Sequence, residues 1–222
     1  MKKVVCLIIA LTVASLCFAE DDKAYTFAGI PWGITVPDLK ARMANKSIFS
    51  FLKELNTEDK PLILYTSSLL KQNDSTIVFY FEKRKLSSIM IQTIASSYFD
   101  DFVKIKSKIE NKYGPAEFSV LNILENHIDE LGIAADLSDD RKQAVVKEFV
   151  KNEKKPLIDV WENKKNSILS LRVANAFIKD STLFKGYAII TQYINDNIDA
   201  ESYFINLVDA DMKDNQRLDD MF

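Results

Sequence analysis

Three strand-like segments joined by short polar stretches constrain the fold of this chain more than any other feature. "PLILYTS" starts at Pro61, "TIVFYFEK" at Thr76 and "KLSSIMIQTI" at Lys85, and all three are rich in β-branched or aromatic residues. The joints "KQNDS" and "KRK" are too short for the crossover that two parallel strands require. The sequence therefore predicts consecutive antiparallel strands.

A second set of strand-like segments follows later in the chain. "PLIDVWEN" starts at Pro156, "SILSLRVA" at Ser167 and "GYAIITQYI" at Gly186. A predicted helix precedes each set, and the same four residues, "KPLI", open both sets at Lys60 and Lys155. This recurrence of element order indicates an α+β fold made of two tandem units, each with a helix packed on an antiparallel sheet.

The stretch "FAGIPWG", residues 27–33, is predicted to turn a short strand over residues 25–27 into a helix. Thr35 has the position of the helix N-cap, and Asp38 that of its capping-box partner. We interpret Trp32 as a packing residue over this corner, in preference to a ligand site.

The strongest helix signal begins at Ser97, which is predicted to form a capping box with Asp100. Its apolar face consists of Tyr98, Phe102, Ile105 and Ile109. Gly114 and Pro115 are predicted to end this helix.

Residues 119–153 are predicted to form a helical hairpin. The apolar stripe of its first helix consists of Leu121, Leu124, Ile128 and Leu131. Gly132 ends that helix, and Ser138 begins a second one that carries Val145, Val146, Phe149 and Val150. Because only the second unit contains this insertion, we expect it to serve either recognition or stabilising packing.

The first 19 residues have the order of a secretory signal, with Lys2 and Lys3 before an apolar run and a small residue, Ala19, at the expected cleavage position. Cleavage there predicts a periplasmic or secreted protein. The alternative is lipoprotein processing, in which an acylated Cys17 anchors the chain to a bacterial membrane, but Leu16 stands where a smaller residue is preferred.

Both cysteines, Cys6 and Cys17, lie within the predicted signal or at its end, so a chain cut after Ala19 must be stabilised by its hydrophobic core. The cut removes two of the 29 basic residues and none of the 32 acidic ones, which leaves 27 against 32 and a net charge of -5. This balance argues against nucleic acid or anionic lipid as the main partner.

The predicted organisation runs from a signal peptide to an acidic tail. A closing helix is expected from about Asp199 through Val208, and the polar, acidic tail after Asp209 is expected to be frayed or disordered. The predicted parts are a signal peptide (1–19), a first helix-plus-sheet unit (20–115), a helical hairpin insertion (116–155), a second sheet with its closing helix (156–208) and an acidic tail (209–222).

Residues suited to catalysis or metal binding are few. His127 is the only histidine, and it lies next to the apolar stripe of its predicted helix. The mature chain offers no cysteine nucleophile. Two acidic stretches, "NDNIDAE" from Asn195 and "DADMKD" from Asp209, lack the glycine and the closing glutamate of an EF-hand loop. We therefore predict no catalytic residue, no metal site and no cofactor, and the binding residues stay unassigned.

Two phrases, "GITVPDLKARM" and "KYGPA", resemble small exported bacterial envelope proteins of the SmpA/OmlA assembly-lipoprotein family and the beta-lactamase inhibitor protein family. Those families pack helices on an antiparallel sheet, and the inhibitor family repeats that unit in tandem. The chain lacks the lipoprotein cleavage signal of the first family and the disulfides of the second. The resemblance implies a non-enzymatic envelope protein that binds another protein, and it identifies no site residue.

The sequence thus favours an exported protein-binding or assembly module that recognises an envelope or extracellular protein through an open sheet face or the helical insertion. Contact with a membrane is expected only if Cys17 is lipidated. One alternative is a hydrolase of envelope glycans that uses two carboxylates in a concave site. Another is a carrier of apolar ligands, which needs an apolar cavity.

Overall fold

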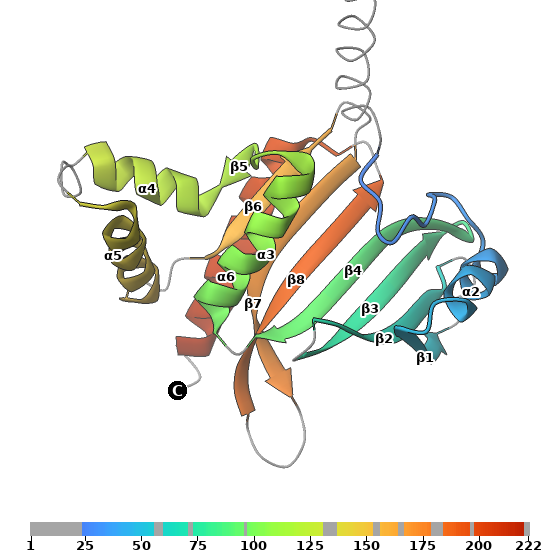
Figure 1. Cartoon of the computed structure of the whole chain (residues 1–222). Helices are drawn as coiled ribbons and strands as arrows, with labels where there is room; N and C mark the ends of the chain where they lie inside the picture. The colour runs from blue at the N-terminus through green and yellow to red at the C-terminus, as the bar shows by residue number, and fades with distance from the viewer. Residues whose placement is uncertain are drawn as a thin grey trace, which may run out of the picture.

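One antiparallel sheet of eight strands organises the chain (Figure 1). The computed structural model describes residues 24–55, 60–70, 73–95, 97–130, 137–152, 156–163, 167–178, 184–195 and 198–219. The strands follow the order β1-β2-β3-β4-β8-β7-β6-β5, and helices pack on both faces of the sheet. The predicted α+β class is confirmed. The predicted signal peptide, with Cys6 and Cys17, lies outside the described residues.

The first four strands are β1 (Phe49–Leu55), β2 (Leu62–Leu70), β3 (Asn73–Glu82) and β4 (Lys85–Ala95). The other four are β5 (Phe118–Ser119), β6 (Ile158–Glu162), β7 (Ser167–Ile178) and β8 (Phe184–Asn195). The described helices are α2 (Val36–Ala44), α3 (Tyr98–Tyr113), α4 (Val120–Glu130), α5 (Asp139–Asn152) and α6 (Ala200–Asp219).

Both predicted strand sets form consecutive antiparallel pairs, as expected, and both belong to the same sheet because β4 pairs with β8. The shared tetrapeptide "KPLI" does not mark equivalent positions. Ile63 of the first copy packs with α2, whereas Ile158 of the second packs with α6 on the opposite face. The interpretation as two tandem units stays a prediction.

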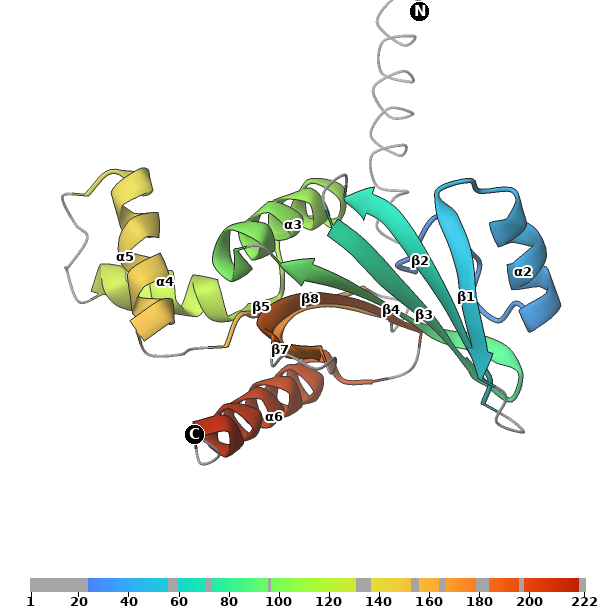
Figure 2. The ribbon, with the colours of Figure 1, turned by 90° about the horizontal axis from the view of Figure 1, so that it is seen from below.

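The two faces of the sheet are covered differently. On the face toward the viewer in Figure 1, called the front face, α2 packs over the β1–β4 half and α3 over the β6–β8 half. The half-buried Tyr193 of β8 packs against both resulting clusters. On the opposite face, called the back face, α6 packs on the half formed by β5–β8 (Figure 2).

The stretch at residues 27–33 forms a turn, and the strand predicted over residues 25–27 is wrong. The Ile30 amide donates to the Phe27 carbonyl at 3.0 Å, with Ala28 and Gly29 at positive φ between them. The Trp32 indole donates to the Tyr25 carbonyl at 2.9 Å, so it closes the corner as a packing residue. Tyr25 and Phe27 are buried, as their alternation predicts, but this segment pairs with no strand.

Both predicted N-caps lie where expected, but their hydrogen bonds differ from a standard capping box. Thr35 accepts from the Asp38 amide, and the Asp38 carboxylate accepts from the Thr35 hydroxyl instead of its amide. The Ser97 amide donates to Asp101, one residue beyond the predicted partner. Asp100 accepts from the Ser97 hydroxyl and also binds Lys147 of α5, so its carboxylate links the start of α3 to α5.

Helices α4 and α5 contact each other and lie beyond the β5 edge of the sheet (Figures 1 and 2). Four of their buried apolar residues belong to the front-face cluster around α3, namely Leu121, Ile128, Val146 and Val150, and the half-buried Leu124 and Val145 pack against it. Leu131 and Gly132, at the predicted end of the first helix, lie outside the described residues. The reading of this segment as an inserted hairpin stays a prediction.

Helix α6 runs through Asp219, so the prediction of a frayed or disordered tail after Asp209 is wrong for residues 210–219. The segment is polar, but it contains no glycine or proline and includes several good helix formers. Asp209, Ala210 and Lys213 are exposed on this helix, and composition alone did not distinguish a polar, exposed helix from disorder.

The β3–β4 turn carries backbone strain. Lys83 and Arg84 both have positive φ, 49° and 62°, the geometry of a type I′ hairpin, which favours Asn-Gly. Replacing them with asparagine and glycine is expected to raise the free energy of unfolding by about 1 kcal/mol. Urea denaturation tests this. A double alanine variant, which removes the same charges and keeps the strain, should show no gain; an equal gain would assign the effect to charge.

Candidate functional site

Nine side chains on the back face of β2, β3 and β4 form a continuous surface, called the open face. The strand register aligns them in three rows, because residues directly opposite each other point to the same side of a sheet. The rows are Leu62, Tyr80 and Ser88; Leu64, Val78 and Met90; and Thr66, Thr76 and Gln92. Val78 is buried, and the other eight are half-buried.

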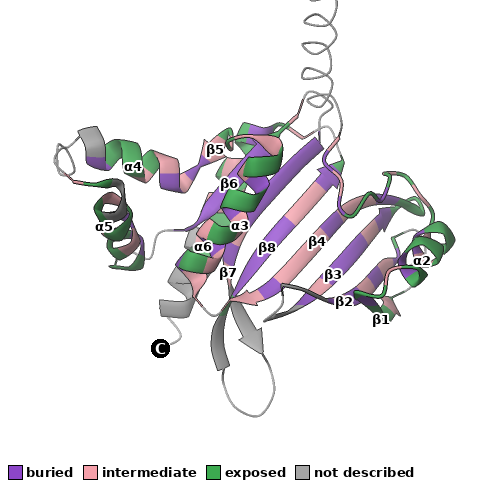
Figure 3. Ribbon diagram, in the orientation of Figure 1, coloured by how far each residue is buried: buried purple, intermediate pink, exposed green. Residues whose placement is uncertain are grey.

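The open face has no helix packed on it within the described part of the chain. Its residues belong to none of the three apolar clusters that helices α2, α3 and α6 help to form. Figure 2 shows α6 beneath the β5–β8 half of the sheet, away from β2 and β3. Where burial is described, most strand residues are buried or half-buried, and β1 is the exception, with five of its seven residues exposed (Figure 3).

No open-face residue is charged, although charged residues make up 27% of the chain. Cations flank the surface instead: Lys53 of β1 is opposite Leu64, and Arg172 of β7 is opposite Ile190, the β8 neighbour of Gln92. A neutral centre containing leucine, methionine and tyrosine with a charged rim is the composition of a protein interface.

Two hydroxyl groups of the open face form hydrogen bonds within the sheet. The Tyr80 hydroxyl donates to Met90 Sδ at 3.8 Å, and Gln192 of β8 donates to the Ser88 hydroxyl at 3.3 Å. Burial raises the pKa of Tyr80, so its phenol stays neutral. The surface can therefore be covered by an apolar partner without leaving a charge buried.

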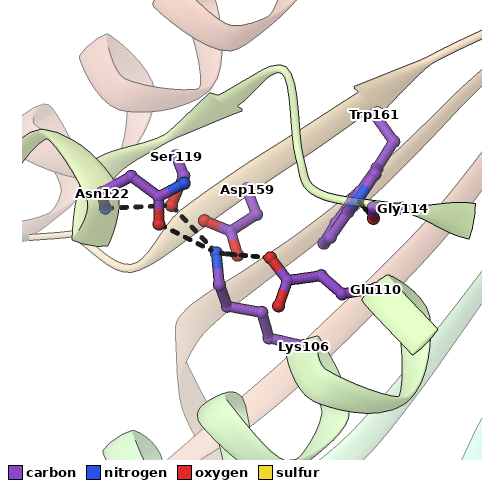
Figure 4. Close-up of polar contacts among 7 residues, drawn as sticks. All are labelled: Lys106, Glu110, Gly114, Ser119, Asn122, Asp159 and Trp161. Atoms are coloured by element: carbon purple, nitrogen blue, oxygen red, sulfur yellow. Dashed lines mark hydrogen bonds and ion pairs between the residues drawn. The ribbon is translucent and has the colours of Figure 1, made fainter. Parts of the chain in front are cut away.

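A second arrangement lies inside the protein, where α3, the start of α4 and β6 meet (Figure 4). Lys106 Nζ of α3 is 2.7 Å from Asp159 Oδ2 of β6 and 3.3 Å from Glu110 Oε1. The same ammonium donates to Ser119 Oγ at 3.1 Å and to Asn122 Oδ1 at 3.5 Å. We call these five residues the buried charge cluster.

Burial dominates the electrostatics of this cluster. The Asp159 side chain is 0% exposed and that of Lys106 is 11% exposed. Burial raises the pKa of Asp159, and the opposing influence of the Lys106 ammonium and the Ser119 hydroxyl does not cancel that rise. Asp159 Oδ1 has no hydrogen-bond partner in the described structure.

The buried charge cluster also positions the adjoining elements. The Ser119 hydroxyl accepts from the Asn122 amide at 3.2 Å, which satisfies a free amide in the first turn of α4. Nearby, the Trp161 indole donates to the Gly114 carbonyl at 3.0 Å and fixes the end of α3 to β6. Sequence reasoning missed this cluster; the available signal was Asp159, an acid inside the apolar run "PLIDVW".

Asp159 and Glu110 are two acids that contact the same ammonium, and the hydrolase alternative needs two acids in one site. Lys106 lies between them, and Asp159 is inaccessible, so this pair does not meet the concave, open geometry that a glycan requires. His127 is exposed on α4.

The acidic stretch that starts at Asn195, the last residue of β8, ends in the first turn of α6. Asp199 Oδ2 accepts from the Ser202 amide at 2.8 Å, and its hydrogen bonds to Ser202 lower the pKa of Asp199. Asn197 lies outside the described residues. Across the described ranges, no three potential ligands of the types His, Cys, Asp and Glu gather in a group able to hold a metal ion.

Comparisons of the chain with protein-family models, curated proteins and solved structures found no match. The resemblance to two families of envelope proteins therefore stays a prediction. Among the described segments, none of the helices combines the length and apolarity needed to span a membrane.

Proposed function

We propose that this protein is an exported, non-enzymatic binding module of the bacterial envelope and that it holds an amphipathic helix of a partner protein on the open face. The observation that carries the proposal is a neutral sheet surface of nine residues, five of them apolar or aromatic, with no helix of the described chain packed on it. Export rests on the signal-like first 19 residues.

The chemistry of the open face favours a protein over other partners. Nucleic acid and anionic lipid require cations, and the open face contains none. Leucine, valine, methionine and tyrosine offer contact area to an apolar protein surface. Lys53 and Arg172 at the rim favour a partner with acidic residues beside its apolar stripe.

The other half of the back face supports a helix as the occupant. There, α6 contributes Tyr203, Phe204, Leu207 and Val208, at helical spacing, to an apolar cluster with Ile158, Val160, Ile168 and Ile194. The Tyr203 hydroxyl also lies 3.2 Å from the Ser170 hydroxyl and 3.3 Å from Gln192 Oε1. The Gln192 side-chain amide also donates to the Ser88 hydroxyl of the open face. Hydrogen bonds therefore connect the two halves of the back face.

An added strand is the competing mode of binding, because β1 is an edge strand with exposed Phe51 and Leu52. The register of β1 shifts between Phe51 and Lys53, and Lys53 is exposed. A bulge and a lysine are the features that protect sheet edges from pairing. We therefore favour helix docking on the face over strand addition at the edge.

The test places a photoreactive benzoyl-phenylalanine at Tyr80, in the cells that make the protein, with the same group at Lys108 on the exposed surface of α3 as the control. We expect a crosslink from position 80 only, to a partner segment with amphipathic helical periodicity. The absence of a crosslink at position 80, or the same crosslinks from both positions, would contradict the proposal.

A further inference from the structure

The buried charge cluster brings an amine and a carboxyl group into contact inside the protein. We propose that Lys106 and Asp159 react with each other to form an intramolecular isopeptide bond, with the Glu110 carboxylate as the proton carrier. The inference is independent of the open face and of its partner. It concerns how the folded chain is covalently stabilised.

The geometry suits nucleophilic attack. Lys106 Nζ lies 2.7 Å from Asp159 Oδ2, one bond away from the carboxyl carbon that the amine must attack. Holding two reacting groups at such a distance replaces a bimolecular encounter with an intramolecular step. Because the Asp159 side chain is 0% exposed and that of Lys106 11% exposed, water has little access to compete for the carbon.

The reaction requires a neutral amine and a neutral carboxylic acid. An ammonium in contact with a carboxylate can transfer its proton to it, and burial favours the neutral pair over the ionic pair. Burial raises the pKa of Asp159, in the direction this transfer needs. Glu110 Oε1, 3.3 Å from the same nitrogen, is placed to accept the second proton that the nitrogen loses during attack.

The step balances without an external reagent. The Nζ–Cγ bond forms, the Cγ–Oδ2 bond breaks, and Oδ2 leaves as water. One hydrogen of that water comes from the carboxylic acid, and the other comes from the amine through Glu110, which returns to its starting state. Oδ1 becomes an amide carbonyl, and a neutral carbonyl without a hydrogen-bond partner costs less than a carboxylate oxygen in the same position.

The bond would join α3 to β6, across 53 residues of sequence. Exported proteins commonly use disulfides for such links, and this chain has no cysteine after Cys17. An isopeptide bond would supply a cross-link that does not depend on thiols.

The test is the intact mass of the denatured, purified protein, followed by peptide mapping. We expect the mass of the mature chain minus one water, and a branched peptide that contains residues 106 and 159. Lys106→Arg, which keeps the charge and removes the amine, should restore the full mass. Asp159→Asn should lose ammonia in place of water, because its amide offers the same carbonyl carbon to the Lys106 amine.

Glu110→Gln separates the proton carrier from the reacting pair, because both reacting groups remain in that variant. At the time when the wild type is fully linked, we expect most Glu110→Gln molecules to have the full mass of the uncross-linked chain. A folded wild type with the full mass and with unmodified peptides at both positions would overturn the proposal. Equally fast linkage in Glu110→Gln would overturn the role of Glu110.

Discussion

Replacing Lys106 with methionine is expected to lower the free energy of unfolding at neutral pH by about 3–5 kcal/mol. Methionine keeps most of the side-chain length, but it leaves the 0% exposed Asp159 carboxylate without its cation. Removing one partner of a buried ion pair is costly because the remaining charge has neither water nor a counterion. Urea denaturation followed by tryptophan fluorescence measures the loss, since Trp161 is buried beside the same elements.

The loss should depend on pH in a defined direction. Burial raises the pKa of Asp159 above its unfolded value, so the folded state binds more protons than the unfolded state between those two values. This contribution to stability is fully present below the unfolded pKa and is lost as the pH rises through the folded pKa. Lys106→Met removes an influence that lowers this pKa, so the deficit relative to the wild type should grow from about pH 4 to pH 7.

Two controls distinguish the stability lost through an unpaired buried charge from the stability lost through fewer packing contacts. The double variant Lys106→Met with Asp159→Leu should recover most of the stability, because two apolar groups replace both charges. Lys147→Met, which removes the partly exposed pair with Asp100, should cost less than about 1 kcal/mol. A double variant as unstable as Lys106→Met, or a loss that does not change with pH, would assign the effect to packing.

The isopeptide bond would enlarge the difference between wild type and Lys106→Met. Closing a segment of 53 residues restricts the unfolded chain, with an entropic effect of up to about 4 kcal/mol. In a linked wild type a neutral amide replaces both charges, so Lys106→Met loses the cross-link and still leaves the buried Asp159 carboxyl group without its partner.

The strands of the sheet were predictable where β-branched and aromatic residues form uninterrupted runs. The two missed strands lack that signal. β1 is exposed at most positions and shifts register between Phe51 and Lys53, and β5 contains only Phe118 and Ser119. Each is held by pairing with a neighbour, β1 with β2 and β5 with β6, so its own sequence does not specify it.

The open face illustrates what depends on tertiary packing. Val78 and Phe79 are adjacent apolar residues, and the sequence allowed a sheet covered on both sides or open on one. The register and the position of α6 determine which side is covered. Phe79 packs under the front-face helix α2, and Val78 lies on the half of the back face that α6 does not reach. Where a helix docks follows from chain connectivity and contacts far apart in sequence. A strand's own residues do not contain that information.

Introducing a carboxylate on the open face by Met90→Glu is expected to reduce partner binding by at least about 30-fold, because an interface that buries an unpaired charge loses about 2 kcal/mol or more. Met90 is half-buried and lies in the central row of the open face, so a docked helix would cover it. The measurement is the yield of the crosslink from position 80, compared across a range of expression levels.

Two matched variants assign the effect to the open face. Ser107→Glu adds the same charge at an exposed position of α3 and should leave the crosslink unchanged, whereas Met90→Leu keeps the surface apolar and should retain binding. Thermal denaturation of all three variants checks that the sheet remains folded. We expect Met90→Glu to fold, because without a bound partner its carboxylate can reach water. If Met90→Glu is folded and its crosslink yield equals that of the wild type, the partner does not cover the central row, and the docking site lies elsewhere on the molecule.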